Sequence, residues 1–212
     1  MSALTRLGYA DPPRVLHQGA SQWRDRLVGL SADKKRHTMG KVGCAITDVA
    51  QAVLIVRQEH ATPITVQARG LNASPPVWTP DRPASARIGR LVRAQGLRCD
   101  DLPIGDDGDD IYTDLDTAAH REAIITTLKA RGVCMLWVDT DSSDLDTGGK
   151  HWVLAHAALL DERAKGIVGV VHVCDPATAR VEGLDLRTLS GCVMWGSRPR
   201  PYAVRAVRPI LR

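Results

Sequence analysis

The order of hydrophobic patterns along the 212 residues limits the folds open to this chain. Helical spacing comes first, in an apolar run from Cys44 to Val56, a short segment from Pro83 to Gln95, and His120 to Arg131. Patterns typical of strands fill most of the remainder, at Val133 to Val138, Trp152 to Leu160, Ile167 to Cys174, Cys192 to Trp195 and Tyr202 to Val207. This segregation predicts an α+β fold, with a helical lobe packed on a mostly antiparallel sheet.

The apolar run from Cys44 to Val56 is expected to form a buried helix that begins at or just before Cys44. Gly40 and Gly43 precede it, and its apolar content is too high for a surface helix. The N-terminus of a helix lowers the pKa of a thiol, because unpaired N–H groups and the macrodipole favour the thiolate. Cys44 is therefore a candidate nucleophile, although a cysteine at such a position can also be a small buried apolar residue. In the first case Gly43 leaves room for an incoming carbonyl, and the Cys44 N–H can serve an oxyanion.

A nucleophilic cysteine needs an imidazole within hydrogen-bond reach, and the chain has seven histidines. His151 and His156 fall on one predicted strand, where the alternation of side chains places them on opposite faces. They cannot share a site. His151 stands at the start of the strand, after the glycines of residues 147–150, and can overhang a cleft. His151 is therefore the candidate base, and His156 is expected to be a core or face histidine.

The third residue of such a site orients the imidazole, and Asp175 is the candidate. It follows the strand that ends at Cys174, and Pro176 after it stops the strand and fixes the turn. Asp-Pro is also a common turn without any catalytic role. Gln18 is the candidate side-chain donor to an oxyanion.

Several short motifs around these residues occur in one order: Gln18 with Trp23, Thr38-Met39-Gly40, Gly43-Cys44-Ala45-Ile46-Thr47, Thr62-Pro63, His151-Trp152-Val153-Leu154 and Asp175-Pro176. In this order they resemble the cysteine peptidase family related to the bacteriocin-leader-processing (double-glycine) peptidases. The resemblance covers about residues 14–180. It implies a papain-like fold with the nucleophile on the helical lobe and the His and Asp on the sheet. It also implies Gln18 as oxyanion glutamine, Cys44 as nucleophile, His151 as general base and acid, and Asp175 as orienting acid, with no metal or organic cofactor.

The predicted domain organisation has three parts. Residues 1–13 form an N-terminal extension, expected to lie over the surface because Pro12 and Pro13 disfavour both a helix and a central strand. Residues 14–183 form the peptidase domain, and 184–212 form C-terminal strands and an Arg-rich end packed on the same domain. Three segments have no place in the family pattern: the Asp-rich run at 100–110, which lacks the EF-hand spacing and is expected to be a solvated loop, the loop from Asp139 to Lys150, and the Arg-rich end.

Composition excludes some classes of protein. The net charge is +4, and the Arg-rich end has only Tyr202 for stacking, so no nucleic-acid binding is expected and the last strand is predicted to have a solvated Arg face. The five cysteines include no C-x-x-C pair, which favours neither a disulfide framework nor a zinc knuckle and fits a reducing compartment. Residues 1–20 lack the apolar stretch of a signal peptide, and no run is long enough for a membrane span.

From these observations we expect hydrolysis of a peptide or related amide bond through a Cys44 thioester. The expected partners are a peptide, a peptidoglycan peptide or a partner-protein substrate, with no membrane span and no nucleic acid. The chain is expected to be cytoplasmic as synthesised, with incorporation into a particle or release left open. The alternative from another class is a binding or structural module of a phage particle or secretion assembly, with the terminal segments as docking arms. Acyl transfer would use the same residues.

Overall fold

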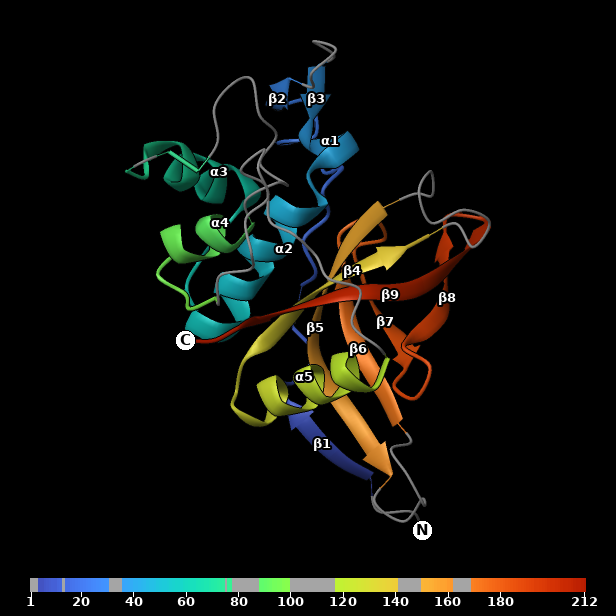
Figure 1. Cartoon of the computed structure of the whole chain (residues 1–212). Helices are drawn as coiled ribbons and strands as arrows, with labels where there is room; N and C mark the ends of the chain where they lie inside the picture. Colours follow the sequence, from blue (N-terminus) through green and yellow to red (C-terminus); the bar gives the residue numbers. More distant parts are fainter. Residues whose placement is uncertain are drawn as a thin grey trace.

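A computed structural model describes residues 4–12, 14–30, 36–74, 76–77, 88–99, 117–140, 150–161 and 169–212. Within these residues most of the helices gather on one side of a larger group of strands (Figure 1). The predicted α+β class, with helices packed on antiparallel strands, is confirmed. The Asp-rich run at 100–110 and residues 141–149 of the long loop lie outside the described part of the chain.

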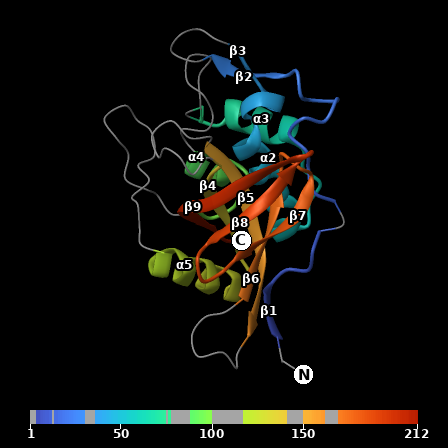
Figure 2. The same cartoon turned by 90° about the vertical axis from the view of Figure 1, so that its right-hand side faces the viewer.

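Six antiparallel strands form a closed barrel. They are β4 (Val133–Asp139), β5 (Lys150–Asp161), β6 (Gly169–Asp175), β7 (Arg180–Asp185), β8 (Ser190–Trp195) and β9 (Arg198–Ile210). Their order is β5-β4-β9-β8-β7-β6, and a pairing between β5 and β6 closes the ring. Figure 2 views the barrel from the side of β7, β8 and β9. The sequence did not predict β7, whose Glu182 and Gly183 obscure any strand pattern.

Within residues 1–13 the sequence analysis did not predict the strand β1 (Leu4–Gly8). It pairs antiparallel with β5, from Leu4 opposite Asp161 to Gly8 opposite Ala157. Proline restricts only its own position and the one before it, so Pro12 and Pro13 leave this earlier segment free to pair. Just after the strand, the Tyr9 N–H donates to the His156 carbonyl over 2.9 Å, which holds the following segment against β5. The N-terminal segment is thus an edge strand of the sheet.

The helical lobe is built around α2 (Cys44–Ala52), which continues as the π-helix η1 (Val53–Arg57). The prediction of a buried helix that begins at Cys44 is confirmed, because every residue from Ala45 to Ala52 is buried. A two-stranded hairpin precedes it, formed by β2 (Leu27–Leu30) and β3 (Arg36–Thr38), and α1 (Met39–Val42) follows the hairpin.

The other helices are α3 (Pro63–Asn72), α4 (Ile88–Ala94) and α5 (Thr117–Lys129). The segment predicted at 83–95 corresponds to α4, and residues 83–87 of that segment lie outside the described residues. The segment predicted at 120–131 corresponds to α5. The sequence analysis did not predict α3, although its start has a clear signal. Thr62 and Thr65 form a capping box, and Pro63 occupies the first turn, where its missing N–H costs nothing.

β5 is the wall shared by two hydrophobic clusters. Trp152 and Leu154 belong to the cluster that contains α2, whereas Val153 and Ala155 belong to the cluster that joins α5 to the barrel strands. This is the alternation expected of a strand that is covered on both faces. The strand therefore carries side chains into both regions of the molecule.

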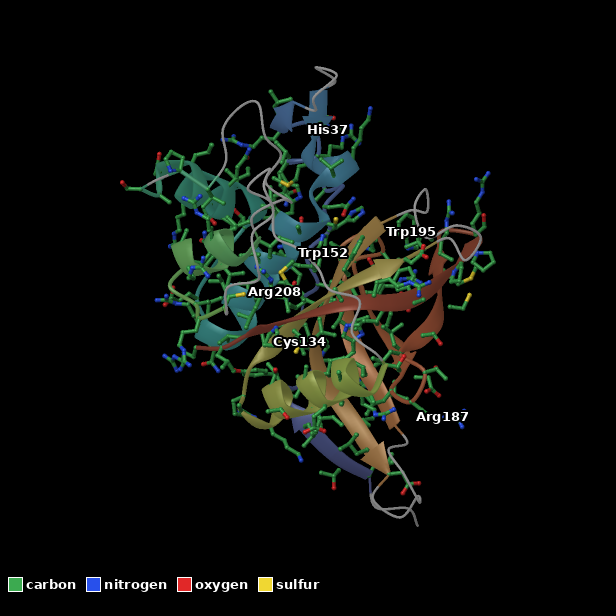
Figure 3. The ribbon with its side chains drawn as sticks, in the orientation of Figure 1. His37, Cys134, Trp152, Arg187, Trp195 and Arg208 are labelled. Carbon is green, nitrogen blue, oxygen red and sulfur yellow. The ribbon has the colours of Figure 1, made fainter. Side chains whose placement is uncertain are left out.

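The Arg-rich end is only partly solvated. Arg198 and Arg212 are exposed as expected, but Arg208 is 2% exposed, so the prediction of a solvated Arg face is wrong at that position. Gly89 of α4 lies against the Arg208 guanidinium, and a Cβ at Gly89 would collide with it. Figure 3 shows Arg208 where β9 passes the helical lobe. No helix in the described residues is both long and apolar enough to span a membrane.

Candidate functional site

Cys44 is the first residue of α2 and is half-buried. Gly43 separates the short α1 from α2, and the first backbone bond of α2 runs from the Thr47 N–H to the Gly43 carbonyl, over 2.9 Å. A Cβ at Gly43 would collide with the carbonyl and side chain of Met39, which is fully buried. Close packing therefore explains this glycine, in addition to any room it leaves for a substrate. No side chain caps α2, so its first N–H groups remain open to an anion.

The surroundings of Cys44 favour its thiolate. Burial works to raise the pKa of Cys44, but the hydrogen bond and positive charge of His151 outweigh it, and the net shift is downward. The backbone N–H groups of Trp152 and Ala45 add to the lowering. An activated thiol requires this combination of a cationic neighbour and backbone donors.

His151, at the start of β5, is held by Asp175, the last residue of β6. β5 and β6 pair antiparallel, with Leu154 opposite Cys174. This register places the start of β5, which carries His151, beside the end of β6, which carries Asp175. His151 Nε2 lies 2.9 Å from Asp175 Oδ1, and both side chains are buried. The other ring nitrogen, Nδ1, is left for Cys44. Burial works to lower the pKa of His151, but Asp175 and Cys44 raise it to about 9.

Asp175 is itself held by groups on both of its oxygens. Oδ1 also accepts from the Ala177 N–H at 2.8 Å, within the turn that follows β6. Oδ2 accepts from the Tyr202 hydroxyl at 2.7 Å. Burial works to raise the pKa of Asp175, but His151 and these donors lower it. The carboxylate is therefore charged and fixed in direction, as the sequence analysis expected of a residue before Pro176.

Two residues of the C-terminal strands complete this network, and the sequence analysis did not select them as site residues. The Trp195 Nε1–H donates to the Tyr202 hydroxyl at 2.7 Å, and the Trp195 ring meets the His151 ring edge-on, with centroids 5.3 Å apart. Figure 3 labels Trp195 near the end of β8. The family resemblance stops at about residue 180, so no motif pointed to them. An aromatic shield of this kind keeps water from the buried His151–Asp175 pair.

Gln18 lies beside the same residues. Its backbone N–H donates to the Pro176 carbonyl at 2.9 Å, and its side-chain amide donates to the Gly40 carbonyl of α1 at 3.1 Å. The bond to Gly40 uses one of the two amide N–H groups. Gln18 therefore links the turn after Asp175 to the helix just before Cys44, and the second N–H can serve an oxyanion.

Asp48 is a third residue that the sequence analysis missed. It lies one helical turn after Cys44 and is 1% exposed, and its Oδ2 has no hydrogen-bond partner among the described residues. Burial, together with the negative charges of Cys44 and Asp175, raises the pKa of Asp48 well above the usual value. Burial and these neighbouring charges therefore favour the protonated form of Asp48. The spacing of four positions from Cys44 was a usable signal, since such residues share a helix face.

A second group of similar side chains lies further along β5 and β6. His156 Nδ1 is 3.6 Å from Cys174 Sγ, and His156 Nε2 is 3.1 Å from Asp11 Oδ1. His172 Nδ1 is 3.2 Å from the same oxygen. Burial raises the pKa of the Cys174 thiol, and burial also lowers the pKa of His156. These shifts keep both groups neutral, so this second group lacks an activated nucleophile.

A cavity of about 670 Å³ opens at the other end of α2. Its walls come from residues 9–12, from Gln51 to Gln58 and from the start of α3, and neither Cys44 nor His151 lines it. Asp11 of the second group does. This cavity is therefore separate from the Cys44 site.

Comparisons with known proteins add no relative. A scan against models of protein families finds no match, and a search of curated proteins finds no similar sequence. Function must therefore be argued from the geometry of this chain.

Proposed function

We propose that the chain is a cysteine peptidase that hydrolyses a peptide or related amide bond. The observation that carries the proposal is the set Cys44, His151 and Asp175, in which a thiol with a lowered pKa at a helix start faces an imidazole bound to a buried carboxylate. Nucleophilic catalysis by cysteine needs a thiolate, a proton carrier and a group that orients the carrier. This set supports all three roles.

In the proposed reaction the Cys44 thiolate attacks the carbonyl carbon, and the electron pair moves to the carbonyl oxygen. The second amide N–H of Gln18 and the Cys44 backbone N–H stabilise that oxyanion. The His151 imidazolium then gives its proton to the leaving amine as the C–N bond breaks, which leaves a thioester. Water, deprotonated by His151, attacks the thioester and releases the acid and the thiolate.

Asp175 acts through His151. Its bond to Nε2 directs Nδ1 at the sulfur and stabilises the imidazolium. The chemistry uses no group other than side chains and water.

The papain-like arrangement and the kinship to double-glycine peptidases belong to this proposal and rest on the motif order. We propose substrates among peptide leaders, peptidoglycan stems or cross-bridges, and partner proteins. Acyl transfer would proceed through the same thioester, with an amine in place of water. A binding or structural module of a particle or secretion assembly is the remaining alternative, but β1 and β9, considered as docking arms, pair within the sheet.

The decisive experiment is reaction of the purified protein with a substoichiometric iodoacetamide-type electrophile, followed by mass mapping of the modified cysteine. We expect selective modification of Cys44, because it is partly exposed and its pKa is lowered. Cys192 is the internal control, since it is exposed and lies outside the site. Cys44 labelling no faster than that of Cys192 would leave the binding-module alternative as the better account.

A further inference from the structure

The group formed by Asp11, His156 and His172 joins three separate segments of the chain. Asp11 follows β1, His156 lies in β5 and His172 in β6. His156 is the extra residue of a β-bulge, between the Ala155–Val173 and Ala157–His172 pairs. The bulge and the segment anchored by Tyr9 bring two imidazoles to one carboxylate, an arrangement that no step of the proposed hydrolysis uses.

The distances within this group match those of a metal site. One ligand atom from each residue lies within 4.8 Å of the others, and the two nitrogen-to-oxygen distances are 3.1 and 3.2 Å. Neighbouring ligand atoms around a tetrahedral zinc ion with bonds of 2.0–2.1 Å are about 3.3 Å apart. Two imidazoles and one carboxylate are also a ligand set that divalent transition metals use, with open positions left for water.

We propose that Asp11, His156 and His172 bind a divalent transition metal ion, with Zn²⁺ as the representative ion. The ion ties the N-terminal segment to β5 and β6. Cys174 supports the site without ligating, because its sulfur contacts Nδ1 of His156 while Nε2 faces Asp11. Ligating histidines generally use their second nitrogen in this way. Asp11 also lines the 670 Å³ cavity, which gives the ion and its water ligands a route to the site.

Arg6 opposes the ion. Its Nη2 lies 2.8 Å from Asp11 Oδ1, the same oxygen that faces both imidazoles. Without an ion, Asp11 with Arg6 and the two histidines is a hydrogen-bonded clasp on the N-terminal segment. The metal site and the simple clasp lead to different expectations. A metal site binds a divalent ion, and removal of the Arg6 charge strengthens that binding. A simple clasp binds no ion.

The test uses the full chain with Cys44→Ala and Cys192→Ser, so that neither the reactive nor the exposed thiol binds metal. After treatment with a chelator under reducing conditions, it is titrated with Zn²⁺ by calorimetry. We expect one ion per chain, and more than a tenfold loss of affinity in both Asp11→Asn and His172→Gln. Bound Co²⁺ should show ligand-field absorption without a thiolate charge-transfer band. His17→Gln, at an exposed histidine outside the group, is the matched control and should keep the affinity.

One further measurement, the Tm in the presence of Zn²⁺, and one further variant, Arg6→Met, separate metal ligation from folding. Zn²⁺ should raise the Tm of the parent but not that of Asp11→Asn. Arg6→Met should bind Zn²⁺ more tightly than the parent. Absence of stoichiometric binding, a thiolate band, or unchanged affinity in Asp11→Asn and His172→Gln would overturn the proposal. Weaker Zn²⁺ binding by Arg6→Met would also overturn the proposal. The losses of affinity in Asp11→Asn and His172→Gln would then be explained by impaired folding of the N-terminal segment.

Discussion

The described part of the chain brings together two Cys–His–Asp groups, and their difference shows what favours a thiolate. Cys44, His151 and Asp175 lie at the start of α2, near the start of β5 and at the end of β6. In the second group, Cys174 lies in β6, His156 lies in the middle of β5, and Asp11 follows β1. Both groups have a sulfur near an imidazole and an imidazole bound to a carboxylate. A search for residue types alone would not separate them.

The two groups differ in the backbone around each sulfur. Cys44 has the open N–H groups of a helix start and an imidazole whose pKa is raised, so charge separation is favoured. Cys174 has its backbone committed to strand pairing and an imidazole whose pKa is lowered by burial. Proximity of sulfur and imidazole is therefore insufficient, and the position of each group within its secondary structure element decides its chemistry.

The largest expected contrast is between the two cysteines. Cys44→Ala should abolish acylation by an activated ester such as p-nitrophenyl acetate, because no other thiol of the site can form the thioester. Cys174→Ala should retain acylation, since a buried neutral thiol takes no part. The measurement is the burst of nitrophenolate with mass detection of the acyl-enzyme. Loss of the burst in Cys174→Ala, in a variant that remains folded, would mean that the second group is the reactive one.

The two histidines of β5 give the next contrast. His151→Ala should slow alkylation of Cys44 and ester turnover by about 10² to 10⁴, the usual cost of a lost general acid and base. His156→Ala should instead lower thermal stability, because it removes buried contacts with Asp11 and Cys174. Alkylation rates per folded molecule and Tm values measure the two effects. Equal rate losses at both positions would show that the two faces of β5 are not separate.

The ion pair of Cys44 and His151 predicts an unusual pH profile. An ordinary thiol alkylates about tenfold faster per pH unit below its pKa of about 8.5. Alkylation of Cys44 should rise less steeply over this range than alkylation of such a thiol, because the pKa of Cys44 is lowered. Amide turnover should fall above a pH of about 9, where His151 loses the proton that the leaving amine needs. A Cys44 rate that rises with pH like a model thiol would exclude the ion pair.

Tyr202→Phe should have a moderate effect. It removes the hydrogen bond to Asp175 Oδ2 and the acceptor for Trp195, which corresponds to a loss of roughly 5- to 30-fold in turnover. The carboxylate then holds the His151 proton more strongly, so the upper limb of the pH profile should move to higher pH. Tyr9→Phe, at a tyrosine bound to the Arg131 carbonyl, is the matched control. An unshifted limb would make Tyr202 a purely structural residue.

Asp48→Asn should give the smallest change, which is an increase in thermal stability. The pKa of Asp48 is raised in the folded protein, so the unfolded chain releases its proton first, and stability falls as the pH rises above the ordinary carboxyl pKa. Removal of the ionisable group should raise Tm at pH 7 by roughly 2–4 °C, or about 1 kcal/mol for a chain of this size. Asp25→Asn, at an exposed aspartate, should leave Tm unchanged. A lower Tm for Asp48→Asn at pH 7 would contradict the raised pKa of Asp48.

Local patterns in the sequence contained much of this structure. The helix start at Cys44 followed from two glycines and an apolar run. The prediction that His151 and His156 do not share a site agrees with their different carboxylate partners, Asp175 and Asp11. The hydrogen bond from Tyr202 to Asp175 could not be predicted, because Tyr202 reaches Asp175 only through the long-range pairing of β9 with β8 and β4. Similarly, Asp11 meets His156 through β1 pairing and a bulge, and neither register leaves a local trace in the sequence.

The hydrogen bond from Tyr202 to Asp175 also has a consequence for timing during synthesis. The nucleophile is made first, but the partners that orient its base are added more than a hundred residues later, and contacts this distant in sequence form late in folding. A nascent chain therefore carries Cys44 as an ordinary thiol while its neighbours on the ribosome are still unfolded. If the proposed function holds, reactivity of Cys44 would therefore appear only after the barrel has closed.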